Sequence, residues 1–220
     1  MNSRSPAAEY ESRLDDGRRI LFRDIRPEDR ELLRRGLERL SPESRYRRFF
    51  RHVDHLSEKE LSYLTEVDFI NHYALIAMLP DEPGAPGIGV ARWIRIEGEP
   101  TVAEAAVTVI DEYQAQGLGK TLLWLLVKSA IESGIRSFRA WVQGENTMIL
   151  GLLSEAGARQ GEWNSGVMEV DIPLPETHEL LEATPAPLVL KEVARGHLEA
   201  EARSEGGAGT QLRAPDTDAS

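Results

Sequence analysis

A strand, a glycine-containing turn and an apolar helix follow one another between Thr101 and Gly134, and this order limits the folds open to the chain. The run "TVAEAAVTVI" (101–110) is rich in β-branched and apolar residues, which predicts a buried strand. The turn "EYQAQGLGK" (112–120) leads into "GKTLLWLLVKSAIESG" (119–134), in which Thr121, Lys128 and Glu132 fall on one stripe and most other side chains are apolar. A helix of this composition must be covered by the rest of its domain.

The turn itself has the features of an anion-binding site. Gly117 and Gly119 lack side chains, so a ligand can approach the backbone closely. No acidic residue lies between Gln114 and Lys120, and a helix N-terminus presents unpaired N–H groups and a positive field. The predicted ligand is a phosphate, in particular a pyrophosphate. A P-loop would need an earlier glycine, and Leu122 occupies the place of the third glycine of a dinucleotide fingerprint.

The flanking sequence predicts an α+β domain. The connections "PDEPGAPG" and "EGEP" join three apolar segments into an antiparallel meander. Strands are expected at 18–25, 72–79, 88–96, 101–110, 137–143, 158–163 and 166–174. Helices are expected at 27–40, at 41–50 with Ser41 as cap, at 57–67 with a capping box of Ser57 and Glu60, at 119–134 and at 146–157.

Composition divides the 220 residues into three regions. Residues 1–17 are expected to be a flexible N-terminus, and residues 18–175 the folded domain. Residues 176–220 form an acidic extension with nine acids, four bases and few aromatic residues. Within it, an amphipathic helix is expected near 188–203, followed by disorder from about residue 204.

Charge and residue types exclude several classes of function. The chain has no cysteine, so it has no disulfide, no thiolate metal site and no cysteine nucleophile. Its net charge of −11 argues against a nucleic-acid partner. The histidines show no metal-ligand spacing, so no metal is expected. The N-terminus lacks an apolar signal core, and the longest apolar run, Leu122 to Val127, is too short to cross a bilayer. We therefore expect a cytoplasmic protein that does not bind membranes.

An arginine-rich segment between Arg34 and Arg51 stands out against the acidic background. It contains seven arginines, at 34, 35, 39, 45, 47, 48 and 51, and only two acids. The simpler interpretation is a solvated helical face. The alternative is a local anion-binding surface for a cofactor phosphate or an acidic partner.

The pattern Gln114-x-x-Gly117-x-Gly119, between an apolar strand and an apolar helix, resembles the acyl-CoA pyrophosphate loop of the GNAT superfamily of N-acetyltransferases. The segment "GENTMILGLLSEAG" (144–157) is similar to the superfamily's segment in which an asparagine opens a helix beside the cofactor. The order of predicted elements over residues 18–174 also matches. The resemblance implies a GNAT fold, with a mixed, mostly antiparallel sheet of six to seven strands flanked by about four helices.

Within that superfamily, four segments resemble the bacterial protein lysine acetyltransferases. They are "LSPESRYRRFF" (40–50), "HYALIA" (72–77), "IGVARW" (88–93) and the Ala103–Glu104 pair ahead of the loop. Members of that family often carry a fused regulatory domain. Only 17 residues precede the first predicted strand, so none is expected on that side.

The resemblance implies roles for individual residues. Glu104 is the implied general base, because an amine must lose a proton before it attacks a thioester; the alternative is a solvated glutamate at a sheet edge. The backbone N–H of Val109 would receive the thioester carbonyl, and Asn146 would bind the pantetheine arm or act only as a helix cap. Leu153 occupies the position of a tyrosine that protonates the leaving thiolate in many relatives. The residues implied to bind acetyl-CoA are Val107, Val109, Gln114, Gln116, Gly117, Leu118, Gly119, Lys120, Thr121 and Asn146.

These features lead to one principal hypothesis and two alternatives. The principal hypothesis is acetylation of protein lysine side chains from acetyl-CoA by direct attack of the amine. The first alternative is the same reaction on a small amine or amino-acid metabolite. The second is a non-catalytic regulator that binds acyl-CoA.

Overall fold

The computed structural model describes residues 9–14, 16–49, 52–143, 159–164 and 167–176. Within these residues, eight strands form one sheet in the order β1-β2-β3-β4-β5-β6-β8-β7. The strands are β1 (Tyr10–Arg13), β2 (Arg19–Asp24), β3 (His72–Met78), β4 (Gly87–Ile96), β5 (Glu99–Val109), β6 (Ser137–Gln143), β7 (Arg159–Asn164) and β8 (Val167–Pro173). The helices are α1 (Arg30–Glu38), α2 (Pro42–Phe49), α3 (Glu58–Thr65) and α4 (Leu118–Glu132), with 3-10 turns η1 (Pro27–Asp29) and η2 (Asp111–Tyr113).

The sheet is antiparallel at every described pair except β5 and β6, which are parallel and joined by α4. The α+β class and the meander of β3, β4 and β5 are confirmed. The eighth strand is β1, which lies in the segment expected to be flexible. It pairs with β2 from Tyr10 opposite Phe22 to Arg13 opposite Arg19. Its short sequence "YESR" carries no apolar run and stays mostly exposed, so the strand depends on its neighbour and has no local signal.

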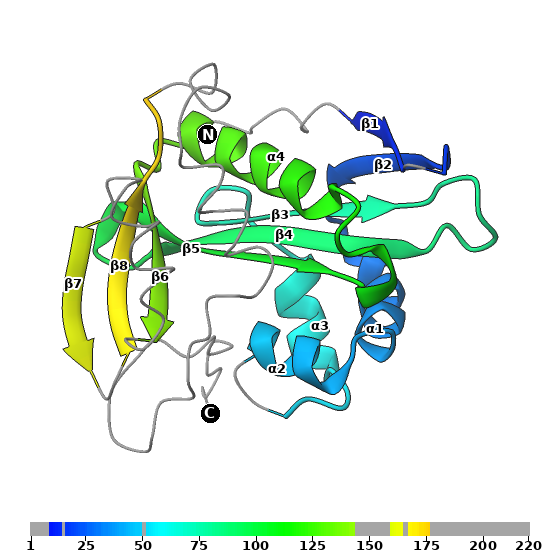
Figure 1. Cartoon of the computed structure of the whole chain (residues 1–220), viewed down its shortest axis with the longest axis horizontal. Helices are drawn as coiled ribbons and strands as arrows, with labels where there is room; N and C mark the ends of the chain where they lie inside the picture. The colour runs from blue at the N-terminus through cyan, green and yellow to red at the C-terminus, as the bar shows by residue number, and fades with distance from the viewer. Residues whose placement is uncertain (1–8, 15, 50–51, 144–158, 165–166, 177–220) are drawn as a thin grey trace, which may run out of the picture.

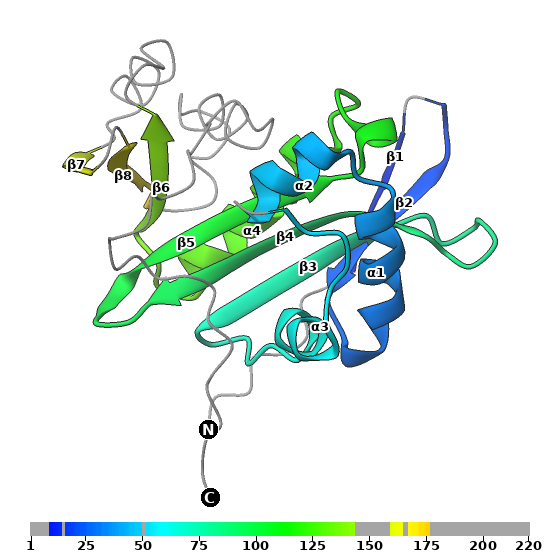
Figure 2. The same ribbon diagram turned by 90° about the horizontal axis from the view of Figure 1, so that it is seen from below.

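Helices cover both faces of the central strands. Figure 1 shows α4 on one face and α1, α2 and α3 on the other, and Figure 2 shows the face that carries α1 to α3. All seven residues of β3 are buried, as expected for a strand that is covered on both sides. The cap of α3 is also confirmed, because Ser57 and Glu60 form the expected capping box.

The packing of α4 fixes its N-terminus over β4 and β5. Leu122 and Leu126 are fully buried in the core that α4 forms with the sheet. The indole Nε1 of Trp93 on β4 donates a hydrogen bond to the Ser129 hydroxyl on α4 at 2.9 Å. A Cβ at Gly89 of β4 would lie 2.8 Å from Leu122 Cδ1, so the helix can sit this close only because residue 89 is glycine.

Candidate functional site

A gap opens between β5 and β6 directly after Glu104. The two strands pair only from Val102 opposite Ser137 to Glu104 opposite Arg139. Beyond Glu104, β5 continues to Val109 in register with β4, while β6 continues in register with β8. Figure 1 shows β5 and β6 diverging from this point. The last five residues of β5 are therefore not paired with β6 in the described structure.

The backbone groups of Val107 and Val109 point into this gap. The Ile110 N–H donates to the Ile88 carbonyl on β4 at 3.1 Å, so in an antiparallel pair the odd-numbered residues before it face away from β4. The Val109 carbonyl confirms this, because it accepts a hydrogen bond from Gln114 Nε2 at 3.0 Å, and that side chain lies outside the sheet. The valine side chains pack into the core beneath α4. The main chain of these residues, rather than their side chains, faces the gap.

The N-terminus of α4 presents unpaired donors to a ligand. Gly117 is the N-cap residue with φ of +82°, a left-handed conformation that favours glycine, and an added Cβ would meet nothing within 4 Å. The N–H groups of Leu118 and Gly119 donate no hydrogen bond within the described part of the chain. The N–H groups of Lys120 and Thr121 both donate to the Gly117 carbonyl, at 3.0 and 3.2 Å. The first turn contains no acid, so its field is positive.

Two glutamines and an aspartate shape the turn before α4. The Gln114 amide donates to the Val109 carbonyl and to Asp111 Oδ1, and the Gln116 amide donates to the Glu112 carbonyl. Asp111 also accepts from the Ser41 N–H at 2.9 Å and from the Ser44 hydroxyl at 2.6 Å. This carboxylate therefore ties the start of α2 to the glycine turn. Asp111 was not among the predicted site residues, although an acid placed directly after a buried strand is a signal for such a role.

Glu104 lies where the two strands separate. It is paired with β4 on one side and with β6 on the other, so it is not at a sheet edge. Its neighbours Ala103 and Ala105 pack beneath α4, which places the half-buried Glu104 side chain on the face that carries α1 to α3. There, burial raises the pKa of the Tyr63 phenol, and the Glu104 carboxylate raises it further.

A cluster of His72, Arg92, Arg48 and Tyr63 lies on the same face. Arg92 Nη1 lies 2.8 Å from His72 Nε2, and Arg92 Nη2 donates to the Leu64 carbonyl at 3.2 Å. Burial lowers the pKa of His72 to about 3, and the nearby Arg92 adds to this, so the imidazole is neutral and accepts the arginine hydrogen bond. Burial lowers the pKa of Arg92 to about 9 and that of Arg48 to about 10, and both guanidinium groups remain charged at neutral pH.

Neither His72 nor Arg92 was among the predicted site residues. The available signal was a single charged residue in the middle of the apolar strand "IGVARW". Three arginines of the 34–51 segment follow the simpler interpretation of a solvated face, whereas Arg45 donates to the Leu40 and Glu38 carbonyls. Arg34 and Arg35 pair with Glu31, and Arg39 pairs with Glu112, all at the surface. Arg48 is different, because it faces a cavity.

The remaining expectations concern Asn146 and Leu153, metal binding and membrane-spanning helices. Asn146 and Leu153 lie outside the described residues. In the described ranges, no group of three or more His, Asp or Glu side chains is placed to hold a metal ion. The helices within those ranges are too short or too polar to span a membrane.

Known proteins share this architecture. A profile of the Acetyltransferase (GNAT) family matches residues 31–157. Acetyltransferase Pat from Mycolicibacterium smegmatis is 33% identical over 163 residues, which cover 73% of this chain and 48% of that protein. Acetyltransferase PA5475 from Pseudomonas aeruginosa is 35% identical over 125 residues, which cover 56% of this chain and 66% of that protein. The chain thus spans about half to two thirds of the length of these relatives.

The comparison with solved structures agrees. The GNAT domain of S. lividans PAT matches with a TM-score of 0.64 and 32% identity, over 78% of this chain and 100% of that domain. The family profile covers more than half of the chain, and the match to the solved domain extends over that domain's whole length. The chain therefore belongs to the GNAT family of acetyltransferases.

Proposed function

We propose that this protein transfers an acetyl group from acetyl-CoA to lysine side chains of other proteins. The observation that carries the proposal is the gap between β5 and β6, into which the main chain of Val107 and Val109 points, beside the N-terminus of α4. A thioester carbonyl needs a hydrogen-bond donor as negative charge develops on its oxygen. The N–H of Val109 fills that role.

The residues around α4 fit the pyrophosphate of acetyl-CoA. The N–H groups of Gly117, Leu118 and Gly119 lie at a helix N-terminus without acids, and the space beside Gly117 is open. The side chain of Lys120 is exposed at the same turn and adds positive charge. Gln114 and Gln116 act through their hydrogen bonds to the main chain, which hold the turn in shape. Thr121 begins the regular helical bonding behind them.

Glu104 is the proposed general base. An ammonium has no lone pair, and a free lysine amine with pKa of about 10.4 is almost fully protonated at neutral pH. Glu104 is the last residue of β5 that pairs with β6, so it stands at the start of the gap, and its carboxylate accepts the proton that the amine must lose. Acetyl-CoA, when bound, supplies the activated acyl group and a thiolate leaving group.

Protein lysine as acceptor is supported by the likeness to Pat and to the S. lividans PAT domain. The test is to incubate the protein with radiolabelled acetyl-CoA and a bacterial lysate, and to separate proteins from small molecules. Labelled proteins are the expected result. If the label appears only in small amines, the acceptor is a small amine and not a protein lysine. Binding of acetyl-CoA without transfer would contradict the proposal as a whole.

A further inference from the structure

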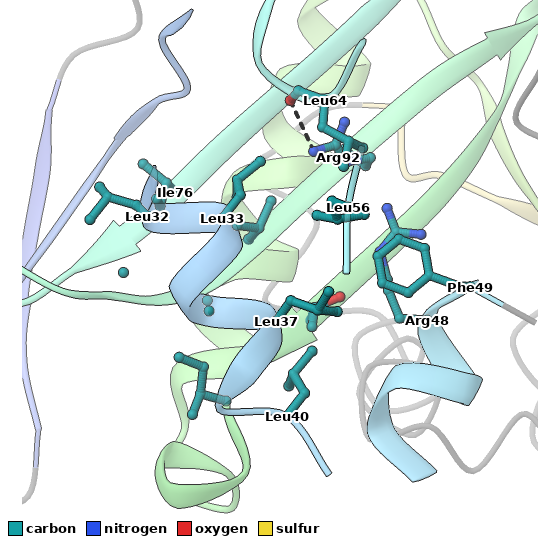
Figure 3. A pocket seen from close by; sticks show the side chains of 16 residues that line it. Leu32, Leu33, Leu37, Leu40, Arg48, Phe49, Leu56, Leu64, Ile76 and Arg92 are labelled. Atoms are coloured by element: carbon teal, nitrogen blue, oxygen red, sulfur yellow. Dashed lines mark hydrogen bonds between the residues drawn. The ribbon is translucent and has the colours of Figure 1, made fainter. Parts of the chain in front are cut away.

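A cavity of about 70 Å³ lies between the sheet and helices α1 to α3. Figure 3 shows the leucines of α1 toward one end of it, and Arg48 with Phe49 of α2 toward the other. Thr108 and Ile110 of β5 also line the cavity. Thr108 lies between the two valines whose main chain faces the gap, so the cavity adjoins the strand at the proposed reaction centre.

Two buried polar atoms of the cavity lining have no hydrogen-bond partner in the described structure. Arg92 is only 3% exposed, and its Nε is buried without a hydrogen-bond partner in the described structure. The Thr108 hydroxyl is likewise buried without a partner there. Unpaired buried donors cost free energy, and a buried charge costs more. A ligand that accepts hydrogen bonds would recover that free energy.

Positive charge predominates among the described residues that line the cavity, while Glu104 lies on the same face of the sheet outside that lining. Arg48 and Arg92 both line the cavity. Burial lowers the pKa of Arg92, and the field of Arg48 lowers it further. The guanidinium of Arg48 lies 5.0 Å from the centre of the Phe49 ring. Of the described residues that line the cavity, none is Asp or Glu. The adjacent His72 is neutral, and a histidine carries no negative charge in either protonation state.

We propose that the cavity binds a carboxylate attached to a short apolar body, and that this carboxylate belongs to one of the two reactants. Arg48 presents a planar fork that suits a carboxylate, and Thr108 and Arg92 supply further donors. The leucines Leu33 and Leu37 provide an apolar wall for the attached carbon atoms. The assignment to a reactant rests on the proposed acetyl transfer; the anion site does not. The two sources are an acceptor amine that carries an acidic group and an acyl group that ends in a carboxylate.

The anion site is tested by binding, without any acetyl transfer. Thermal unfolding of the full chain is followed with increasing butyrate or with its uncharged amide, at constant ionic strength. Butyrate should raise Tm and the amide should not. Arg48→Met and Arg92→Met should each weaken butyrate binding at least about tenfold, the usual effect of losing a charged hydrogen bond. The matched control is Arg35→Met, which removes the same charge from an exposed position on α1 and should bind butyrate as the wild type does.

Equal stabilisation of the wild type and both cavity variants would overturn the site, and so would equal effects of butyrate and its amide. If Arg92→Met does not fold, Arg48→Met decides alone.

Whether the carboxylate belongs to the acceptor or to the acyl donor is then identified from KM values of the wild type and Arg48→Met. These are measured with lysine peptides that carry Glu or Gln beside the lysine, and with acetyl-CoA or succinyl-CoA. A KM that rises about tenfold only for the Glu peptide identifies the acceptor, and one that rises only for succinyl-CoA identifies the donor. Unchanged KM values in all four cases would overturn the assignment to a reactant, while the acetyl transfer measured in the same assays would still support the proposed function.

Discussion

Arg92 is a charged residue in the middle of the sheet, and small neighbouring residues leave space for its side chain. Its partners in register are Ala74 on β3 and Ala106 on β5, and these two small side chains leave space for the guanidinium group. One step along the strands, His72 and Glu104 flank Ile94 on the same face. His72, Arg92 and Glu104 come from three neighbouring strands and therefore share the face that carries α1 to α3, because side chains alternate along each strand.

The neutral state of His72 makes the stability of the fold depend on pH. Its pKa in the folded protein is about 3, below the ordinary value of 6.5. As pH falls below 6.5, the unfolded chain gains a proton that the folded chain does not, so stability decreases through this window and is fully retained only above it. Between about pH 6.5 and about pH 5, the wild type should lose up to about 2 kcal/mol more than His72→Asn, which keeps a hydrogen-bond acceptor and does not titrate. Urea unfolding of both proteins across this range measures the difference, and parallel losses would contradict the assignment.

Gly117 is expected to be required for both conformation and binding. Gly117→Ala and its matched control Gly134→Ala place a Cβ at positive φ in open space, at opposite ends of α4. Each should lower stability by about 1 kcal/mol, because a left-handed conformation is strained for alanine. Only Gly117→Ala should weaken acetyl-CoA binding, measured by calorimetry, since its Cβ enters the space proposed for the pyrophosphate. If both variants bind acetyl-CoA as the wild type does, the turn is not the cofactor site.

At the scale of the elements, the sequence predicts most strands and helices because their signals are local. The apolar run of β3 and the cap of α3 can be recognised from neighbouring residues alone. The strand β1 cannot, because it is held by its pairing with β2 and by ring contacts of Tyr10 with Phe22 and Trp124. The cavity likewise depends on where α1 packs against β4, which no local pattern encodes.

Replacement by alanine should have opposite effects on stability at Gly89, which lies against α4, and at Gly36, which lies in α1. Gly89→Ala should destabilise the fold by roughly 1–3 kcal/mol, because its Cβ would overlap Leu122 and lie 3.2 Å from the Thr108 carbonyl. Gly36→Ala, in the open interior of α1, should stabilise it by about 0.5–1 kcal/mol through helix propensity. Chemical denaturation of both variants checks the pair. Similar stability changes of the same sign would show that α4 does not sit as described.

At the scale of the whole molecule, the candidate site forms where a parallel crossover enters an antiparallel sheet. The strand β6 pairs with β5 over three residues and then turns to β8, which leaves the gap beside the N-terminus of α4. The sequence indicated the glycine turn and Glu104 as candidates for the site, since each has a motif. It did not predict the contact of Asp111 with α2 or the pairing of Arg92 with His72, because these contacts join segments far apart in the chain.

The central claim is that Glu104 takes the proton from the attacking amine, and its most direct test is kcat/KM of Glu104→Gln against pH. The acceptor is a lysine substrate identified in the lysate experiment, and the control is Glu97→Gln, an exposed change in the turn between β4 and β5. The variant should bind acetyl-CoA normally and lose about 10²–10⁴-fold in kcat/KM near neutral pH. Its rate should then climb toward high pH as the amine, with pKa of about 10.4, deprotonates unaided. A Glu104→Gln variant that matches wild type and Glu97→Gln at neutral pH would contradict this account.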